Sequence, residues 1–129
     1  MSYYFGKTLE IGFEEAVNRV IEELKKEGFG ILTEIDVKET LKKKLDVDFR
    51  KYKILGACNP SFAYKALLAE DKIGIMLPCN VILQEIAEDE IEVAAVDPLA
   101  SMQAVNNPEL SNIAKQVQEK LQGIINNLK

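Results

Sequence analysis

The sequence predicts an α+β fold in which a mainly antiparallel sheet is covered by helices. Two long amphipathic helical patterns lie near the ends of the chain, with short strand-like runs of apolar residues between them. The charged turn Glu88-Asp89-Glu90 joins two of those runs and indicates a hairpin. No linker, low-complexity tract or change in composition divides the chain, so residues 1–129 are expected to form a single domain.

The first part of the chain predicts two strands and two helices. Residues 3–9 are rich in aromatic residues and indicate a first strand. The apolar residues of the next segment, 13–27, recur at helical spacing, and Gly28 fits the C-cap that ends this helix. Over residues 29–37 the odd positions are expected to share one face of a second strand, and a short Lys-rich helix follows over residues 38–45.

The second part predicts a strand over residues 52–58, then a helix that runs to about Glu70. Asn59 is expected to cap this helix and Pro60 to occupy its first turn, where a proline loses no hydrogen bond. Residues 73–86 are expected to be extended, with a kink or bulge near Pro78 because a proline donates no ladder hydrogen bond.

The last part of the chain predicts the second hairpin strand and the longest helix. The strand covers residues 91–96 and ends at Asp97-Pro98. Pro108 begins the final helix, whose apolar stripe runs to Leu128. Gly123 lies within this helix, where a glycine costs roughly 1 kcal/mol against Ala unless another backbone approaches closely.

Composition excludes several classes of enzyme and site. The chain has no His, which removes Ser-His-Asp and Cys-His triads, His-ligated zinc and phosphohistidine chemistry. Its 16 basic and 21 acidic residues give a net charge of -5, which argues against a nucleic-acid partner. The sequence shows neither a secretory signal nor an apolar run long enough to cross a membrane, so we expect a cytoplasmic protein with no membrane partner.

The two cysteines lie in the one motif that the sequence repeats, a Cys-Asn pair. They occur in the tripeptides Ala57-Cys58-Asn59 and Pro78-Cys79-Asn80, each where a predicted strand ends or bends. Thiols at matched positions of neighbouring strands would touch, since adjacent strands lie about 4.8 Å apart. The candidate ligand-binding residues are those of the two Cys-Asn pairs, their prolines and one nearby carboxylate: Cys58, Asn59, Pro60, Pro78, Cys79, Asn80 and Asp97.

Three interpretations of the cysteines stay open at this point. They are small buried apolar residues, or a reactive thiol pair in which a helix N-terminus lowers the pKa of Cys58, or ligands for a soft metal such as Cu(I). The metal reading is weak because two thiolates are half of a zinc shell and no His completes it, so we predict no metal and no cofactor. For thiol chemistry, the proton partners suggested are Asp97, Tyr64 and Lys65.

A basic run lies between Lys38 and Lys53, with Phe49 and Tyr52 among its residues. Such a run attracts anions if it is left unpaired. Acidic residues also occur within it, so a solvated helix face explains it better than a binding site does.

Four motifs in order resemble one uncharacterised prokaryotic family, the domain of unknown function 302. They are Gly28-Phe29-Gly30-Ile31-Leu32-Thr33-Glu34-Ile35-Asp36-Val37, Leu55-Gly56-Ala57-Cys58-Asn59-Pro60, Leu77-Pro78-Cys79-Asn80-Val81 and Asp97-Pro98. The resemblance runs from about Tyr3 to Leu128 and implies a TATA-binding-protein-like fold. In that fold a curved antiparallel sheet, β-α-β(4)-α with extra short helices, is packed by the first and last helices.

The resemblance implies no established activity, and a fold name does not transfer DNA binding. It does suggest, by analogy, that the protein is a homodimer, and the stripe of the last helix with Gly123 offers a contact for the second copy. We therefore expect a small cytoplasmic binding or accessory protein of unknown function, with a small-molecule ligand at the two Cys-Asn pairs. The alternative is an enzyme that performs thiol-dependent redox or sulfur-transfer chemistry with Cys58 or Cys79, and the sequence does not choose between the two.

Overall fold

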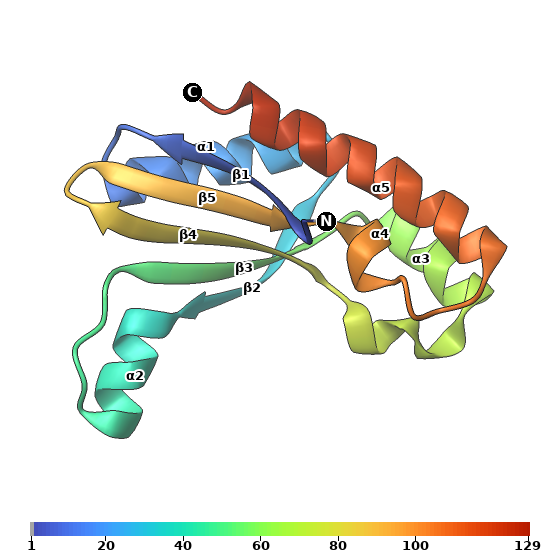
Figure 1. Cartoon of the computed structure of the whole chain (residues 1–129), viewed down its shortest axis with the longest axis horizontal. Helices are drawn as coiled ribbons and strands as arrows, with labels where there is room; N and C mark the ends of the chain where they lie inside the picture. The colour runs from blue at the N-terminus through green and yellow to red at the C-terminus, as the bar shows by residue number, and fades with distance from the viewer. Residues whose placement is uncertain (1) are drawn as a thin grey trace.

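The computed structural model describes residues 2–129 and is built on a curved, five-stranded antiparallel sheet (Figure 1). The strand order is β1-β5-β4-β3-β2, so β4 lies in the middle and β1 and β2 are the edges. The predicted α+β class and the β-α-β(4)-α order are confirmed. The strands are β1 (Tyr4–Leu9), β2 (Gly30–Asp36), β3 (Tyr52–Cys58), β4 (Cys79–Ala87) and β5 (Glu90–Val96).

Two long helices, α1 and α5, pack on the same side of the sheet, and α3, α4 and a 3₁₀ helix gather at one end of it (Figure 1). None of the helices within residues 2–129 has the length and apolar character that a membrane crossing requires. The helices are α1 (Phe13–Lys26), α2 (Val37–Leu45), α3 (Pro60–Ala69), the 3₁₀ helix η1 (Asp71–Met76), α4 (Pro98–Ser101) and α5 (Pro108–Asn127).

The apolar stripes of α1 and α5 form the core, as their periodicity predicts. The larger cluster, here called the sheet cluster, joins both helices to alternate residues of the strands, from Leu9 to Leu128. Gly28 ends α1 with a φ of 86°, the left-handed backbone conformation that a glycine adopts without strain. A smaller cluster, the end cluster, lies under α3, α4 and η1 and consists of Ala66, Ile73, Met102, Leu110, Ile113 and Ala114.

The stripe of α5 is buried within the subunit, so it offers no contact to a second copy. Its residues Leu121, Ile124 and Ile125 are at most 3% exposed. A Cβ added at Gly123 would meet nothing within 4 Å, so no neighbouring backbone explains this glycine. The homodimer contact that the sequence suggested at this helix is therefore not available to the apolar stripe.

The prediction of extended chain over residues 73–86 is wrong for its first part. Residues 71–76 form η1, and β4 begins only at Cys79. The physical reason is burial: Ile73 is 1% exposed in the end cluster, and Met76, three residues later, packs against that cluster from the same side of the turn. Pro78 follows with a cis peptide bond to Leu77, immediately before the strand.

The predicted alternation over residues 29–37 is also interrupted. A bulge between Ile31 and Thr33 shifts the register of β2 against β3, so Leu32 is 65% exposed and the odd positions no longer share one face. Val37 belongs to α2, which the Asp36 carboxylate caps by accepting a hydrogen bond from Glu39 N at 3.0 Å. Bulges are common on edge strands such as β2.

Candidate functional site

An apolar cavity of about 40 Å³ lies where the sheet cluster meets the end cluster. Strands β3 and β4 provide one wall, and helices α3 and α5 provide the others. Four of the seven candidate residues line it: Cys58, Asn59, Pro78 and Cys79. The remaining lining is apolar and consists of Phe29, Ala57, Phe62, Ala63, Ala66, Leu77, Pro98, Met102, Leu110, Ile113, Ala114 and Val117.

Antiparallel pairing brings the two Cys-Asn pairs together. β3 ends at Cys58 and β4 begins at Cys79, and the register pairs Cys79 with Ala57 rather than with Cys58. The two thiols are thus close but offset by one position, so the matched arrangement considered from sequence does not occur. Gly56 leaves room for Thr33 and Pro78 beside β3, because a Cβ there would clash with Thr33 Oγ1 and come within 2.8 Å of Pro78 Cγ.

The two thiols differ in burial. Cys79 is 8% exposed, while Cys58 is half-buried at the end of β3, and neither forms a disulfide. Burial, with a further contribution from the Cys58 thiol, raises the pKa of Cys79 to about 11. Cys79 is therefore protonated at neutral pH and is a poor nucleophile, which speaks against its use in redox or sulfur-transfer chemistry.

Asn59 has a different structural role from the predicted one. It occupies the N-cap position of α3, but its side chain caps no backbone N–H. Its Nδ2 instead donates a hydrogen bond of 3.2 Å to the carbonyl oxygen of Glu27, beside Gly28 in the turn that follows α1. Asn59 thus fastens the start of α3 to that turn, and Pro60 is exposed in the first turn of α3.

Asn80 and Asp97 are not part of the cavity lining. Asn80 is exposed, because it is next to the buried Cys79 in the strand and so points to the opposite face of the sheet. Asp97 caps α4 by accepting from Leu99 N at 3.0 Å, and it accepts from Gln118 Nε2 at 3.1 and 3.2 Å. These bonds give Asp97 a structural role between α4 and α5.

The other proton partners suggested for thiol chemistry also lie outside the lining. Tyr64 is 65% exposed on α3. The Nζ of Lys65 lies 5.8 Å from the centre of the Phe62 ring, on the exposed side of the same helix. None of the three predicted proton partners, Asp97, Tyr64 and Lys65, therefore lines the cavity with the two thiols.

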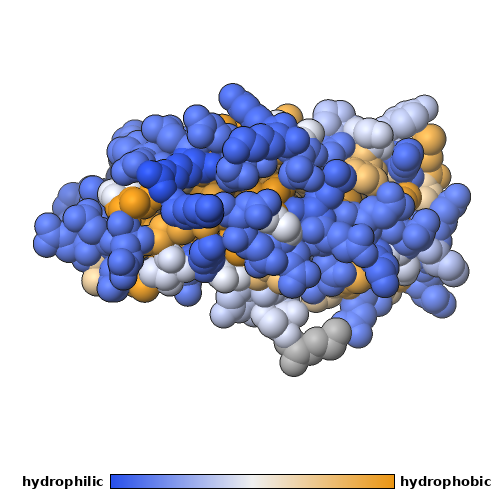
Figure 2. All heavy atoms as spheres, turned by 90° about the horizontal axis from the view of Figure 1, so that it is seen from above, coloured by the Kyte–Doolittle hydropathy of each residue, from blue (hydrophilic) through white to orange (hydrophobic). Residues whose placement is uncertain are grey.

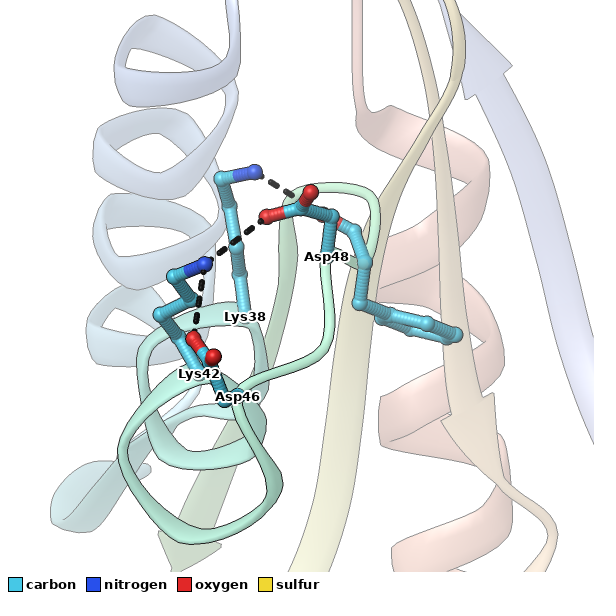
Figure 3. A network of polar contacts seen from close by, with 5 residues as sticks. Lys38, Lys42, Asp46 and Asp48 are labelled. Atoms are coloured by element: carbon cyan, nitrogen blue, oxygen red, sulfur yellow. Dashed lines mark hydrogen bonds and ion pairs between the residues drawn. The ribbon is translucent and has the colours of Figure 1, made fainter.

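The basic run forms a solvated surface, as its acidic neighbours suggested (Figure 3). Lys42 on α2 pairs with Asp46 at 3.0 Å and with Asp48 at 3.4 Å, and Lys38 donates to the carbonyl oxygen of Phe49 at 2.9 Å. These contacts fold the loop after α2 back onto the helix. The lysines are thus partly neutralised by their own loop, which weakens the run as an anion site.

The contribution of α3 and α5 to the cavity was not predicted from the sequence. Ala63, Ala66 and Ala114 leave the space that larger side chains would fill. The sequence does carry a signal, because residues 60–69 are apolar around most of the helix. In the structure only Ala66 of α3 is buried, so the other apolar side chains line the cavity or reach the surface. Seen from above, hydrophobic side chains reach the surface at the end of the molecule that carries α3 (Figure 2).

Within residues 2–129, no group of three or more His, Cys, Asp or Glu side chains is placed to hold a metal ion. The sulfur atoms in the cavity wall are those of Cys58, Cys79 and Met102, and no carboxylate lines the cavity with them. The chemistry of this site is thus that of an apolar pocket with soft, polarizable sulfur in its wall.

Comparison with known proteins gives a family and a fold. The family profile described as "Domain of unknown function DUF302" matches residues 5–128. A crystal structure of an uncharacterized conserved DUF302 protein from Bacillus stearothermophilus superposes with a TM-score of 0.92 at 27% sequence identity, over 100% of both chains. No curated protein matches the chain. The chain is thus a member of the DUF302 family, whose function is unknown.

Proposed function

We propose that this protein binds a small apolar molecule in the cavity lined by Cys58 and Cys79. The observation that supports this is the convergence of four candidate residues on a single pocket that has almost no polar lining. Because the lining exposes almost no polar surface, a ligand that enters the cavity displaces little well-bound water and gains dispersion contacts with the surrounding side chains. Recognition would depend on shape and dispersion rather than on charge.

The size of the cavity limits the ligand. About 40 Å³ accommodates only a few heavy atoms in the conformation described. A larger ligand requires the wall formed by α3 to move outward. We expect movement of this wall because Ala66 is the one buried residue of α3 and Leu68 is 70% exposed.

The thiols act in this proposal as lining, not as nucleophiles. Cys79 stays protonated because its pKa is raised to about 11, and a neutral thiol packs as a small apolar group. A protonated, buried sulfur suits a non-covalent role. We also propose that the protein works in the cytoplasm, since Cys58 and Cys79 are free and a reducing compartment keeps such thiols free.

Xenon is a direct probe of this pocket because it is apolar and small. In wild-type protein under xenon pressure, we expect methyl NMR shifts at Ala66, Met102 and Ile113, which line the cavity. The variant Ala63→Leu fills the pocket and should lose these shifts. The matched variant Ala87→Leu adds the same atoms at an exposed position of β4 and should keep them.

Two results would overturn the proposal. One is the absence of xenon-dependent shifts at the lining methyl groups of wild-type protein. The other is a set of shifts that the Ala63→Leu variant, shown by its NMR spectrum to be folded, retains in full. The comparison with Ala87→Leu separates filling of the pocket from a general effect of a larger side chain.

A further inference from the structure

A groove of about 420 Å³ lies on the face of the sheet turned away from α1 and α5. It is here called the tyrosine groove, because Tyr3, Tyr4 and Tyr52 line it. These are three of the four tyrosines in the chain. The groove crosses β1, β5, β4 and β3, and its volume is in the range of sites that hold small molecules.

Small residues on β1 and β5 leave the groove open. The register of these strands sets Gly6 opposite Ala94, and neither has a side chain larger than a methyl group. The ring of Tyr4 lies over Gly6, because a Cβ added there would lie 3.2 Å from Tyr4 Cε2. Ile82 of the central strand is the partner of Ala94 on the other side and also lines the groove. The floor of the groove is therefore apolar and suits an apolar part of a ligand.

Tyr3 and Tyr4 form an aromatic corner at the start of β1. Their ring centres are 5.2 Å apart, and the ring planes meet at 68°. Both side chains are accessible, since Tyr3 is 71% and Tyr4 43% exposed. The face of an aromatic ring attracts cations, and proteins bind quaternary ammonium groups among several such rings. The corner therefore offers two ring faces to a positively charged ligand.

One carboxylate, that of Glu92 on β5, lines the tyrosine groove. Glu92 is half-buried, and its Oε1 accepts a hydrogen bond of 2.8 Å from Gln84 Nε2. Gln84 is itself oriented by Arg50, whose Nε donates to Gln84 Oε1 at 2.8 Å. The bond from Arg50 fixes which end of the Gln84 amide faces Glu92. The amide in turn positions the carboxylate at the groove.

Within residues 2–129, no lysine or arginine lines the tyrosine groove. Arg50 is bound to the far end of the Gln84 amide, and its guanidinium lies 4.3 Å from the centre of the Phe49 ring. Over the same part of the chain, Glu92 forms no ion pair. The charge of Glu92 is therefore left for a ligand to balance, and the net charge of -5 adds to the attraction of a cation.

We propose that the tyrosine groove binds an organic ammonium ion with an apolar body. The charged head contacts the Glu92 carboxylate, and the ring faces of Tyr3 and Tyr4 attract the same charge. The apolar body covers Ala94 and Ile82 on the floor of the groove. An anionic ligand does not fit this site, because Glu92 would repel it.

Binding of n-hexylammonium, compared with that of 1-hexanol, tests the proposal. The two molecules share an apolar chain and differ in the charge of the head. In an NMR titration, hexylammonium should shift the backbone amide signals of Ile82, Glu92 and Ala94, and its dissociation constant should be about fivefold lower than that of hexanol. The anion hexanoate should bind more weakly than hexanol. Tyrosine fluorescence gives a second readout, because the chain has no Trp and three of its four tyrosines line the groove.

Two pairs of variants assign the contacts. Glu92→Gln keeps the shape of the side chain and should raise the dissociation constant of hexylammonium about fivefold, without changing that of hexanol. Glu90→Gln removes the same charge at the exposed start of β5 and should change neither. Tyr4→Leu removes one ring face and should weaken the binding of hexylammonium about threefold, whereas Tyr64→Leu on α3 should not. Circular dichroism checks that each variant is folded.

Equal binding of hexylammonium and hexanol by wild-type protein contradicts the proposal, and this comparison needs no variant. An unchanged affinity of the Glu92→Gln variant for hexylammonium also contradicts it, because the preference for positive charge would then come from another site. Ligands in the cavity beside Cys58 are followed by different signals, those of Ala66 and Met102. The two proposals therefore fail independently.

Discussion

The two faces of strand β4 differ in burial: alternate residues are buried under the helices, and the residues between them are not. Cys79, Val81 and Leu83 belong to the helix-covered face and are at most 8% exposed. Their neighbours Asn80 and Ile82 belong to the face turned away from α1 and α5, the open face, and are exposed or half-buried. Since successive side chains of a strand point to opposite sides, the Cys79-Asn80 pair contributes to two surfaces, whereas Cys58 and Asn59, where β3 ends, both line the cavity.

The largest expected effect compares Leu83 with its neighbour Ile82. Leu83 is 0% exposed in the sheet cluster, so Leu83→Ala removes buried contacts and should lower the free energy of unfolding by about 3 kcal/mol. Ile82→Ala, on the open face, should lower it by less than about 1 kcal/mol. Urea unfolding followed by circular dichroism measures both changes.

The two variants control for each other, because each removes most of a large aliphatic side chain from β4 and only the face differs. Equal losses for the two variants in dilute solution would mean that the open face is part of the folding core. That outcome would remove the contrast between the faces.

The next effect tests whether the covered face keeps water from Cys79. The pKa of the Cys79 thiol is about 11 in the folded chain, against an ordinary 9.0, because burial disfavours the thiolate. Below pH 9 the thiol is protonated in both states, so the full stability is present. Between pH 9 and 11 only the unfolded chain loses this proton, which should lower the free energy of unfolding by about 2 to 3 kcal/mol.

Lysines and tyrosines titrate in the same range, so the measurement is a difference between variants. Urea unfolding at pH 8 and pH 11 should show a smaller loss of stability for Cys79→Ala than for wild-type protein. Cys58→Ala keeps the buried thiol of Cys79 and should show a loss close to that of wild-type protein. If Cys79→Ala and wild-type protein lose the same amount, Cys79 is open to water and the cavity is not a dry pocket.

The sequence predicted those elements whose burial has a clear period. The stripes of α1 and α5 were predicted because each of these helices buries a single face, and the shared face of Ile91, Val93 and Ala95 was predicted because all three are buried in the core. The prediction from sequence failed at η1, where Ile73 packs in the end cluster, and at the bulge of β2 beside Leu32. In both places contacts distant in the chain override the local pattern.

The candidate site was predicted in part for a related reason. Cys58 and Cys79 occupy strand ends, and an antiparallel pairing of those strands brings the ends together. The one-position offset between them depends on the register, which local sequence does not specify. The alanines of α3 and α5 that leave the cavity open have no distinctive chemistry, so only their packing reveals them.

The smallest expected effect compares the two asparagines of the Cys-Asn pairs. Asn59 Nδ2 donates to the carbonyl oxygen of Glu27, so Asn59→Ala removes a bond between α3 and the turn after α1 and should cost about 1 kcal/mol. Asn80 is exposed on the open face, so Asn80→Ala should change stability by no more than about 0.5 kcal/mol. Thermal unfolding of both variants in dilute protein measures the difference. Equal effects would show that the two pairs are equivalent after all, whereas a loss for Asn59→Ala alone assigns it to fastening the wall of the cavity.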